Sequence, residues 1–522
     1  MNETNTCSAA SLNCNNFNAI MQFLGKQPEN YTREDMLKVI DHFNTKRITF
    51  HYTALDGKLK ELKIPVYNER SAELILTDGE RVDGSSLFKG VVDVEKSDLY
   101  VIPLYKTAFL NPFEEGSLDF MCRFVTSDGQ PAAYTPDSIL ENAANKFTEL
   151  SGYELYSHPE LEFYLIGTNE YCEYPNTPQR AYHQSAPFSK TTEILSEIED
   201  ILNSTVNAKV KYAHNEVGVL NNLESELPEL RGKYAEQVEI EFSLAPSRDI
   251  GDIVSLSKWI IRNVAFGYGF IATFVPKLEP DNAGSGMHFH NALYKNGRNV
   301  MTDAKGQLSE DAHILIGGLC KYAQTLTAFG NTVAASYLRL VPHQEAPTRV
   351  CWDFSNRSAL IRVPLGWNNV SNLASIVNPQ QKTKIDDSES RATVEIRTPD
   401  GSCFPQYLVA GILVATEWAF AHKEDALELA KTCRVDCDIN SADFHRQLDE
   451  LPASCVESGE LLSKNRALYT ESGIFTDKII DYFVKLLSTE NDRDLNGNML
   501  TLGKNERLVQ ARKYMHKAIH RF

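Results

Sequence analysis

The sequence predicts an α+β protein with a small β-rich domain near the N-terminus, a larger mixed domain and a helical C-terminal region. Three observations support this prediction. Short runs in which polar and apolar residues alternate, separated by turn signals, fill about residues 46–130. Apolar strands then alternate with amphipathic helices, and the pattern after about residue 405 is mostly helical. A chain of 522 residues also exceeds what one hydrophobic core usually serves.

The composition excludes several classes of function. The chain has 52 basic and 70 acidic residues, a net charge of −18, and so repels the phosphate backbone of nucleic acids. No apolar run reaches the length of a membrane-spanning helix, and the first residues carry no secretory signal. Ten cysteines are too few for a disulfide scaffold. We therefore expect a cytoplasmic protein that binds neither nucleic acid nor membrane.

The N-terminal part is predicted to contain a lead with one helix, residues 1–45, and a β-rich domain, residues 46–130. Thr32 and Asp35 form a capping box at the start of the helix. The strands RITFHYT and LKELKIP flank Asp56-Gly57, which is a strong hairpin turn signal. The segments AELILTDGERVDGSS, SDLYVIPL and SLDFMCRFV are expected to continue the strand pattern.

The next domain, residues 131–430, is predicted to combine helices and strands. Thr135-Pro136 begins a helix that ends near Gly152, because proline is favoured in the first turn of a helix and glycine just after its end. Further amphipathic helices are predicted at 190–203, 252–266 and 308–329. The C-terminal extension, residues 431–522, is predicted to be helical. Its last helix, 504–522, is basic and is expected to dock on the protein surface or on another subunit.

Four apolar strands each carry two polar residues separated by a single apolar residue, and such residues project from the same face of a strand. Ordinary half-exposed strands alternate in the same way. Here, however, nearly all of the polar residues are carboxylates or imidazoles, and carboxylates on one face repel each other unless cations neutralise them. Such a group suits Mg²⁺ or Mn²⁺, and two such ions can clamp a phosphoryl group. The pairs are Glu160 and Glu162, Glu239 and Glu241, His288 and His290, and Glu395 and Arg397.

Arginines in three further segments indicate an anionic substrate. The guanidinium fork matches carboxylate and phosphate oxygens, although single arginines more often form surface ion pairs. No Gly-Lys-Ser/Thr phosphate loop is present in the sequence, and Gly284-Ser285-Gly286 does not begin a dinucleotide-binding unit. The residues alone therefore lead to a metal-dependent phosphoryl-transfer or ligase site. The four arginines are Arg339, Arg357, Arg362 and Arg397.

The order of these motifs resembles that of the glutamine synthetase family, in particular its prokaryotic type I glutamate–ammonia ligases. The resemblance extends from about Arg47 to the helices past residue 400. It implies a β-grasp fold for residues 46–130 and a catalytic domain with a curved antiparallel sheet flanked by helices for residues 131–430. The motifs are VDGSS, HPELEFYL, HNEV, EQVEIEF, ATFVPKLEPDNAGSGMHFH, SYLRLVPHQEAP, NRSALIRVP and VEIRTPD.

The resemblance also implies two catalytic metal ions, Mg²⁺ or Mn²⁺, and defined places for glutamate and ATP. One ion would be held by Glu162, Glu216 and Glu239. The other ion would be held by Glu160, His288 and Glu395. L-Glutamate would be bound by Gly284, Arg339 and Arg397. The phosphates of ATP would face His290, Arg357 and Arg362, of which Arg357 would also be catalytic.

The ammonium substrate would lie in a pocket built by two subunits. One subunit would contribute Tyr182 and Glu216, and its neighbour would contribute Asp83 and Ser86. Asp83 would accept a proton from the ammonium ion. Glu345, on a flap, would close the site and exclude water. Family members form rings of six subunits that are commonly stacked in pairs, so the resemblance implies a homo-oligomer, a hexamer or dodecamer, with shared sites.

The sequence departs from the family pattern at several positions. A segment that includes VLNNLESELPELRGKY separates Glu216 from Glu239, so Glu236 and Glu241 are alternative ligands. On the nucleotide and glutamate side, expected polar residues are replaced at four positions. These positions are Ala283, Ala292, Leu338 and Thr393.

Three functions remain open. The first is a glutamine synthetase, which joins ammonia to L-glutamate with ATP through a γ-glutamyl phosphate. The second is a γ-glutamyl ligase that uses an organic amine. The third is a non-catalytic, regulatory member of the family. The residues of the ammonium pocket favour the first function, and the presence of all six candidate metal ligands disfavours the third.

Overall fold

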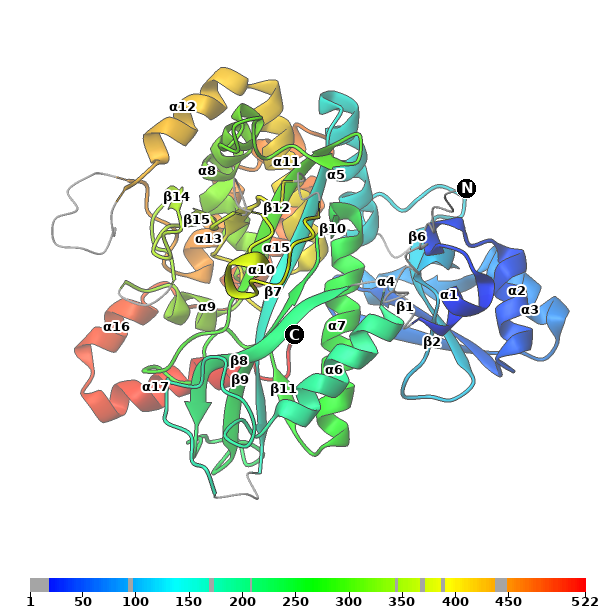
Figure 1. Cartoon of the computed structure of the whole chain (residues 1–522), viewed down its shortest axis with the longest axis horizontal. Coiled ribbons are helices and arrows are strands. Elements are labelled where there is room, and N and C mark those ends of the chain that lie inside the picture. Colours follow the sequence, from blue (N-terminus) through cyan, green and yellow to red (C-terminus); the bar gives the residue numbers. More distant parts are fainter. Residues whose placement is uncertain are drawn as a thin grey trace.

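Figure 1 shows the computed structural model, which describes residues 18–92, 97–168, 173–206, 209–342, 346–366, 371–385, 390–436 and 448–522. These residues form two sheets with helices around them, and the predicted α+β class is confirmed. The N-terminal sheet lies on the right in Figure 1, and the larger sheet runs through the centre. None of the helices in this described part of the chain is long and apolar enough to cross a membrane.

The N-terminal sheet is organised around β1, which pairs antiparallel with β2 and parallel with β6. The predicted hairpin at Asp56-Gly57 is therefore confirmed, and Gly57 has a φ of 74° that glycine adopts without strain. In sheet order the strands are β2 (Leu59–Pro65), β1 (Arg47–Thr53), β6 (Ser117–Val125), β4 (Asp98–Pro103) and β3 (Glu80–Asp83), with β5 (Phe109–Leu110) on β6. The helices beside it are α1 (Ala19–Leu24), α2 (Arg33–His42), whose predicted capping box is present, and the short α4 (Gly84–Leu87).

One predicted strand in this domain is wrong. The segment AELILTD lies in helix α3 (Glu69–Asp78), Gly79 caps the end of this helix, and only the residues after it form a strand, β3. Asn68 and Ser71 form a capping box at the start of α3. Ala72, Ile75 and Leu76 follow the helical spacing and are buried, so the helix covers the sheet with its apolar side. The cap and this spacing outweigh the strand preference of the short apolar run.

The larger sheet places all four strands with charged pairs next to one another, in the order β16, β12, β7, β9. These neighbours are antiparallel. In order the strands are β14 (Trp352–Phe354), β15 (Ile361–Val363), β16 (Val394–Ile396), β12 (Met287–Lys295), β7 (Glu154–Gly167), β9 (Tyr234–Phe242) and β8 (Val210–Leu220). Shorter strands extend the pairing of the central strands: β10 (Ala245–Pro246) and β11 (Ile271–Thr273) pair with β7, and β13 (Arg298–Asn299) pairs with β12.

The apolar residues between the charged ones are buried on the opposite face of this sheet. Leu161, Ile240, Phe289 and Ile396 are fully buried in one core. The helices α7 and α8 contact this sheet, and α11 packs on α5, α7 and α8. The helices are α5 (Pro136–Ser151), α6 (Thr192–Thr205), α7 (Ser247–Gly267), α8 (Glu310–Gly330), α9 (Ala334–Arg339), α10 (Ala374–Val377), α11 (Pro405–Ala421) and α12 (Lys423–Cys433). The helices predicted from about residues 135, 190, 252 and 308 are therefore present.

The C-terminal residues are helical, and their last helix docks on the same chain. Met515 and Ile519 are buried against Leu223 and Leu230 of the loop between β8 and β9. Arg512 donates to Glu224 of this loop at 2.5 Å and also to both carboxylate oxygens of Glu279, at 2.8 and 2.9 Å. The inserted segment noted in the sequence is thus fastened to the C-terminal helix. The helices are α13 (Cys455–Lys464), α14 (Ala467–Thr470), α15 (Asp477–Ser488), α16 (Leu495–Thr501) and α17 (Lys504–Lys517).

An ion-pair cluster joins the N-terminal sheet to the helices of the larger domain. Arg123 on β6 contacts Asp252 on α7 at 2.7 Å and Asp137 on α5 at 4.0 Å. Burial opposes the charge of Arg123, but Asp252 and Asp137 raise its pKa above the ordinary value. The guanidinium therefore stays charged and neutralises two carboxylates at the junction.

We expect Arg123→Met to lower the free energy of unfolding by about 3 kcal/mol, because two largely buried carboxylates lose their cation. Urea unfolding followed by circular dichroism measures this change. Arg298→Met, at an exposed arginine on β13, serves as the control and should change the free energy by less than about 0.5 kcal/mol. Equal effects of the two variants would contradict the role assigned to Arg123.

Candidate metal and substrate site

The charged side chains of the larger sheet lie opposite one another across neighbouring strands. Residues directly opposite in an antiparallel pair share a face and lie close together. Glu160 on β7 is opposite His288 on β12, and Glu162 is opposite Glu239 on β9. On either side, Glu395 is opposite His290, and Glu239 is opposite His214 on β8. The register thus collects residues between positions 160 and 395 on one face of a single sheet.

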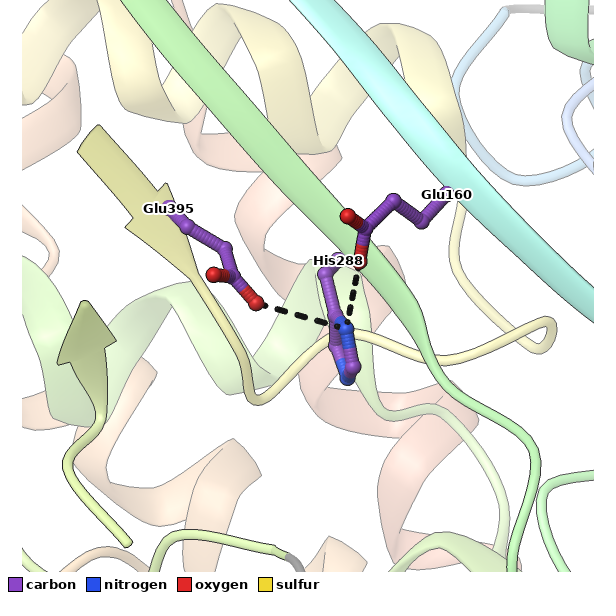
Figure 2. A group of neighbouring side chains, drawn as sticks. All are labelled: Glu160, His288 and Glu395. Atoms are coloured by element: carbon purple, nitrogen blue, oxygen red, sulfur yellow. Dashed lines mark hydrogen bonds and ion pairs between the residues drawn. The ribbon is translucent and has the colours of Figure 1, made fainter. Parts of the chain in front are cut away.

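Glu160, His288 and Glu395 form the first group of candidate metal ligands, and Figure 2 shows His288 between the two carboxylates. Nδ1 of His288 lies 3.0 Å from Glu160 and 3.5 Å from Glu395. One ligand atom from each residue lies within 4.8 Å of the others. His290 adds a second imidazole, since its Nε2 contacts Glu160 at 2.8 Å. The three residues that the family resemblance assigned to one metal are therefore adjacent in space.

The second group consists of His214, Glu216 and Glu239. The His214 ring lies 3.2 Å from Glu239 and 3.8 Å from Glu216. Sequence analysis named the two glutamates but did not assign His214 to the site. The signal was present in the motif HNEV, because His214 precedes Glu216 by two positions and such residues share a face of a strand. Glu162 lies beside this group, opposite Glu239, rather than within it.

A bulge in β8 aims Glu216 at the site. The pairing of β8 with β9 shifts between Asn215 and Val219, so β8 has extra residues at this point. Bulges bend a strand locally and redirect its side chains. Gly218 lies inside the bulge, where a Cβ would come within 2.2 Å of the Tyr164 hydroxyl oxygen. Only glycine fits there without displacing Tyr164.

The structure distinguishes Glu239 from its neighbour Glu236, which the sequence left as an alternative ligand. Glu236 is fully buried and accepts hydrogen bonds from the backbone N–H groups of Lys190 and Thr191, both at 3.0 Å. The Thr191 hydroxyl donates to it as well, at 2.7 Å. Glu236 therefore holds the start of α6, away from the candidate ligands. The other alternative, Glu241, bonds Lys211 at 2.6 Å and lies opposite Glu160.

The carboxylates of the site are not equally neutralised. Burial and the charges of Glu162 and Glu160 raise the pKa of Glu239 well above its usual range. Burial raises the pKa of Glu162 too, more than Arg339 lowers it. By contrast, the imidazoles of His290 and His288 outweigh burial and hold the pKa of Glu160 well below its usual range. The site thus combines several carboxylates with imidazoles, and the carboxylates around Glu239 lack a neutralising cation. Such a set of ligands fits hard divalent cations such as Mg²⁺ or Mn²⁺.

Three of the predicted arginines converge on this face. Arg397 and Arg362 donate to the two oxygens of Glu395, at 2.6 and 2.7 Å. Arg339 is buried and donates to the carbonyl oxygen of Thr398 at 2.8 Å. A Cβ at Gly284 would come within 2.8 Å of the Arg339 side chain, so glycine permits this close approach.

The residues predicted to face the nucleotide have separate surroundings. His290 bonds Thr393 through Nδ1 at 2.8 Å, so the threonine found where an arginine was expected positions the imidazole. The His290 ring also stacks on His158, with ring centroids 4.4 Å apart. Arg357 is exposed and close enough to Tyr182 to lower the pKa of that phenol, although burial raises it more. The replacements Ala292 and Leu338 are buried apolar residues.

The residues predicted to bind ammonium lie in two places. Tyr182 is half exposed, and its ring lies 5.5 Å from that of His214 in an edge-to-face contact. Asp83 and Ser86 are at the end of β3 and in α4, where Ser86 donates to Asp83 at 2.7 Å. The hydrogen bonds recorded for Asp83 stay within this turn. Glu345, the predicted flap residue, lies outside the described residues.

Two family models match the chain. The model described as "Glutamine synthetase, catalytic domain" matches residues 133–496, which is more than half of the sequence. The chain belongs to the glutamine synthetase family. The model described as "Glutamine synthetase, beta-Grasp domain" matches residues 44–127, the region of the N-terminal sheet. The family resemblance inferred from the motifs is therefore confirmed.

The sequences of individual relatives align with most of this chain. A glutamine synthetase of Pyrococcus abyssi is 30% identical over 440 residues, which are 84% of this chain and 89% of the relative. A protein of Cupriavidus pinatubonensis named 3-hydroxylaminophenol mutase is 29% identical over 498 residues, 88% and 95% of the two chains. The solved structure of Plasmodium falciparum glutamine synthetase has a TM-score of 0.70 and 20% identity, and covers 91% of this chain and 98% of its own. The likeness to this structure concerns the fold.

We expect Mn²⁺ or Mg²⁺ to raise the midpoint of thermal unfolding, because a cation that binds only the native state stabilises it. Glu395→Ala and Glu239→Ala should each lose most of this increase, one from each group of ligands. Glu154→Ala, at the exposed start of β7, is the matched control and should keep it. Differential scanning fluorimetry with the metal and with EDTA measures the shift. A full metal response in both site variants would exclude these residues as ligands.

Proposed function

We propose that this protein catalyses the ATP-dependent ligation of ammonia to L-glutamate through a γ-glutamyl phosphate. The observation that carries the proposal is the convergence of Glu160, His288 and Glu395 with His214, Glu216 and Glu239 on one face of the sheet. Arginines suited to carboxylate and phosphate groups border the same face. A carboxylic acid and a polyphosphate can therefore be held together there.

The two groups of ligands are proposed to hold two divalent cations, with Glu162 beside the second group. When bound, such ions neutralise the phosphoryl group and the developing charge of the transferring phosphate. Arg339 and Arg397 would bind the carboxylates of glutamate, and Arg362 and Arg357 would bind phosphate oxygens. His290 would remain positioned by Thr393 at 2.8 Å. Glu345 would exclude water from the acyl phosphate.

The amine half of the reaction requires a group that binds ammonium and then accepts a proton. Tyr182 and Glu216 would hold the cation, because a phenol oxygen and a carboxylate both accept hydrogen bonds from it. Asp83 would accept the proton. Hydrogen bonds from Ser86 and Ser85 lower the pKa of Asp83, which keeps this carboxylate negatively charged and able to attract the ammonium cation. We propose that a neighbouring subunit of a homo-oligomer supplies Asp83 and Ser86 to each site.

One observation favours an organic amine, instead of ammonium, as the substrate. Tyr182, His183 and Tyr212 surround His214 with aromatic rings, at centroid distances of 5.5, 4.3 and 5.7 Å. Aromatic faces attract organic ammonium groups as well as ammonium itself. A γ-glutamyl ligase that uses an organic amine is therefore the alternative. The relative named 3-hydroxylaminophenol mutase is consistent with more than one activity among related chains.

The test is an assay of amide formation from glutamate and ATP with Mg²⁺ or Mn²⁺. The amine is ammonium, methylamine or ethanolamine, each at the same concentration. We expect glutamine to form fastest, and Glu162→Ala or Glu395→Ala to abolish the reaction through loss of a metal ligand. Product analysis by mass spectrometry identifies the amide. Faster product formation with an organic amine would establish the alternative. Absence of glutamate-dependent ATP turnover would refute both ligase proposals.

The shared site predicts complementation between two inactive variants. Asp83→Ala should reduce amide formation by about 10²-fold, the usual contribution of a general base, and should spare phosphoryl transfer more. Refolding a mixture of Asp83→Ala and Glu395→Ala subunits should restore activity, since some sites combine intact residues from each chain. Arg81→Ala, at an exposed residue of β3, is the control for the Asp83 substitution. If the refolded mixture is no more active than the two variants alone, the site is not built by two subunits.

A further inference from the structure

A cavity of about 240 Å³ lies at the seam between the N-terminal hairpin, helix α7 and the last residues of the chain. None of its lining residues belongs to the candidate metal and substrate site. Its side chains are basic, aromatic or neutral, and none of them is Asp or Glu. The lining residues are Gly57, Lys58, Leu59, Val254, Ser255, Lys258, Trp259, Arg262, Asn263, Pro405, His520, Arg521 and Phe522.

Arg262 is the unusual residue of this cavity. Its Nη2 atom is buried and has no hydrogen-bond partner, and in the described part of the chain the residue forms no ion pair. The guanidinium lies over the Phe274 ring, 4.9 Å from its centroid. Burial lowers the pKa of Arg262 to about 10, and no carboxylate offsets this effect. A largely desolvated guanidinium that bonds no anion lowers the stability of the folded protein. A bound anion would remove this penalty.

Other buried arginines of the protein do have partners. Arg123 bonds Asp252, and Arg397 bonds Glu395. Arg339 donates to the carbonyl oxygens of Thr398 and Arg397. Of these four arginines, Arg262 is the one that bonds neither a carboxylate nor a carbonyl oxygen in the described residues. It also lines a cavity.

The other cations of the cavity add to its positive charge. Lys258 is buried and donates to the carbonyl oxygen of Gly401 at 2.7 Å, which satisfies only one of its three donors. Lys58, at the hairpin, is exposed. Arg521 and His520 are already paired, with Glu490 at 2.8 Å and Glu229 at 3.2 Å. Arg262, Lys258 and Lys58 therefore remain as the cations that line the cavity and form no ion pair with an Asp or Glu of the described residues.

We propose that this cavity binds a small oxyanion, the phosphate or carboxylate group of a small molecule. Arg262 lines the cavity and provides the main contact, because a guanidinium N–H forms a charge-assisted hydrogen bond to such an anion. Lys258 and Lys58 supply further positive charge. Trp259 and Phe522 line the same cavity and give an apolar wall for the remainder of the ligand. The proposal does not depend on the ligase activity.

Isothermal titration calorimetry tests the proposal with inorganic phosphate and malonate as probes, in EDTA so that no metal carries phosphate into the other site. We expect one of the probes to bind the wild-type protein. Arg262→Gln should weaken this binding by about tenfold or more, because a charge-assisted hydrogen bond is lost. Arg298→Gln, the same change at an exposed arginine, should bind as the wild type does. Preference for phosphate or for malonate distinguishes the two sources of the anion.

Thermal unfolding gives a second readout. The bound anion should raise the unfolding midpoint of the wild type and of Arg298→Gln but not of Arg262→Gln. If Arg262→Gln does not fold, Arg262→Lys and Lys58→Gln replace it, and each should weaken binding. The proposal is overturned if neither probe binds the wild type, or if the Arg262 variants bind as well as it does. Dissociation of the oligomer in Arg262→Gln, with no effect of the anions, would also overturn it.

Discussion

The register of one antiparallel sheet is the constraint on which the candidate site depends. Glu160, His288 and Glu395 share a face only because β7, β12 and β16 pair as they do. A slip of one residue would turn every side chain of a strand to the opposite face. The buried residues Leu161 and Phe289 oppose such a slip, since it would move them out of the core and move charges into it. Packing on one face thus secures the chemistry on the other.

The same arrangement accumulates negative charge that the protein itself neutralises only in part. Glu395 is bonded by Arg362 and Arg397, and Glu160 by two imidazoles. Among the described residues, His214 is the one basic group that forms an ion pair with Glu239, and the neighbouring carboxylates raise the pKa of Glu239. A cation bound between these groups would remove the repulsion. This is the physical link between the fold and the proposed phosphoryl-transfer chemistry.

The second group of ligands depends on contacts at the far end of the chain. His214 and Glu216 lie on β8 and Glu239 lies on β9, and the loop that joins these strands packs against α17. Leu223 and Leu230 share a core with Met515 and Ile519. The inserted segment therefore packs against another part of the same chain, and this contact fixes the loop end of the hairpin, next to the bulge in β8.

Much of this protein followed from the sequence because the relevant signals are local. The spacing of Glu160 and Glu162 places both on one face of a strand, and Thr32 with Asp35 marks a helix start. Other features did not follow. The segment AELILTDG has an apolar run that suits a strand as well as a helix, and its true state depends on packing. Sequence analysis kept Glu236 as an alternative to Glu239 although the two lie three positions apart, a spacing that places them on opposite faces of a strand.

By itself the sequence determined the types of residue, the face on which each lies within its strand, and the family. The tertiary structure alone decided that Glu239 joins His214 and Glu216, that Glu236 accepts hydrogen bonds at the start of α6, and that Arg262 lines a cavity without an Asp or Glu side chain. The physical reason is distance along the chain. Contacts between residues tens or hundreds of positions apart are set by strand order, bulges and helix docking, and no local pattern encodes them.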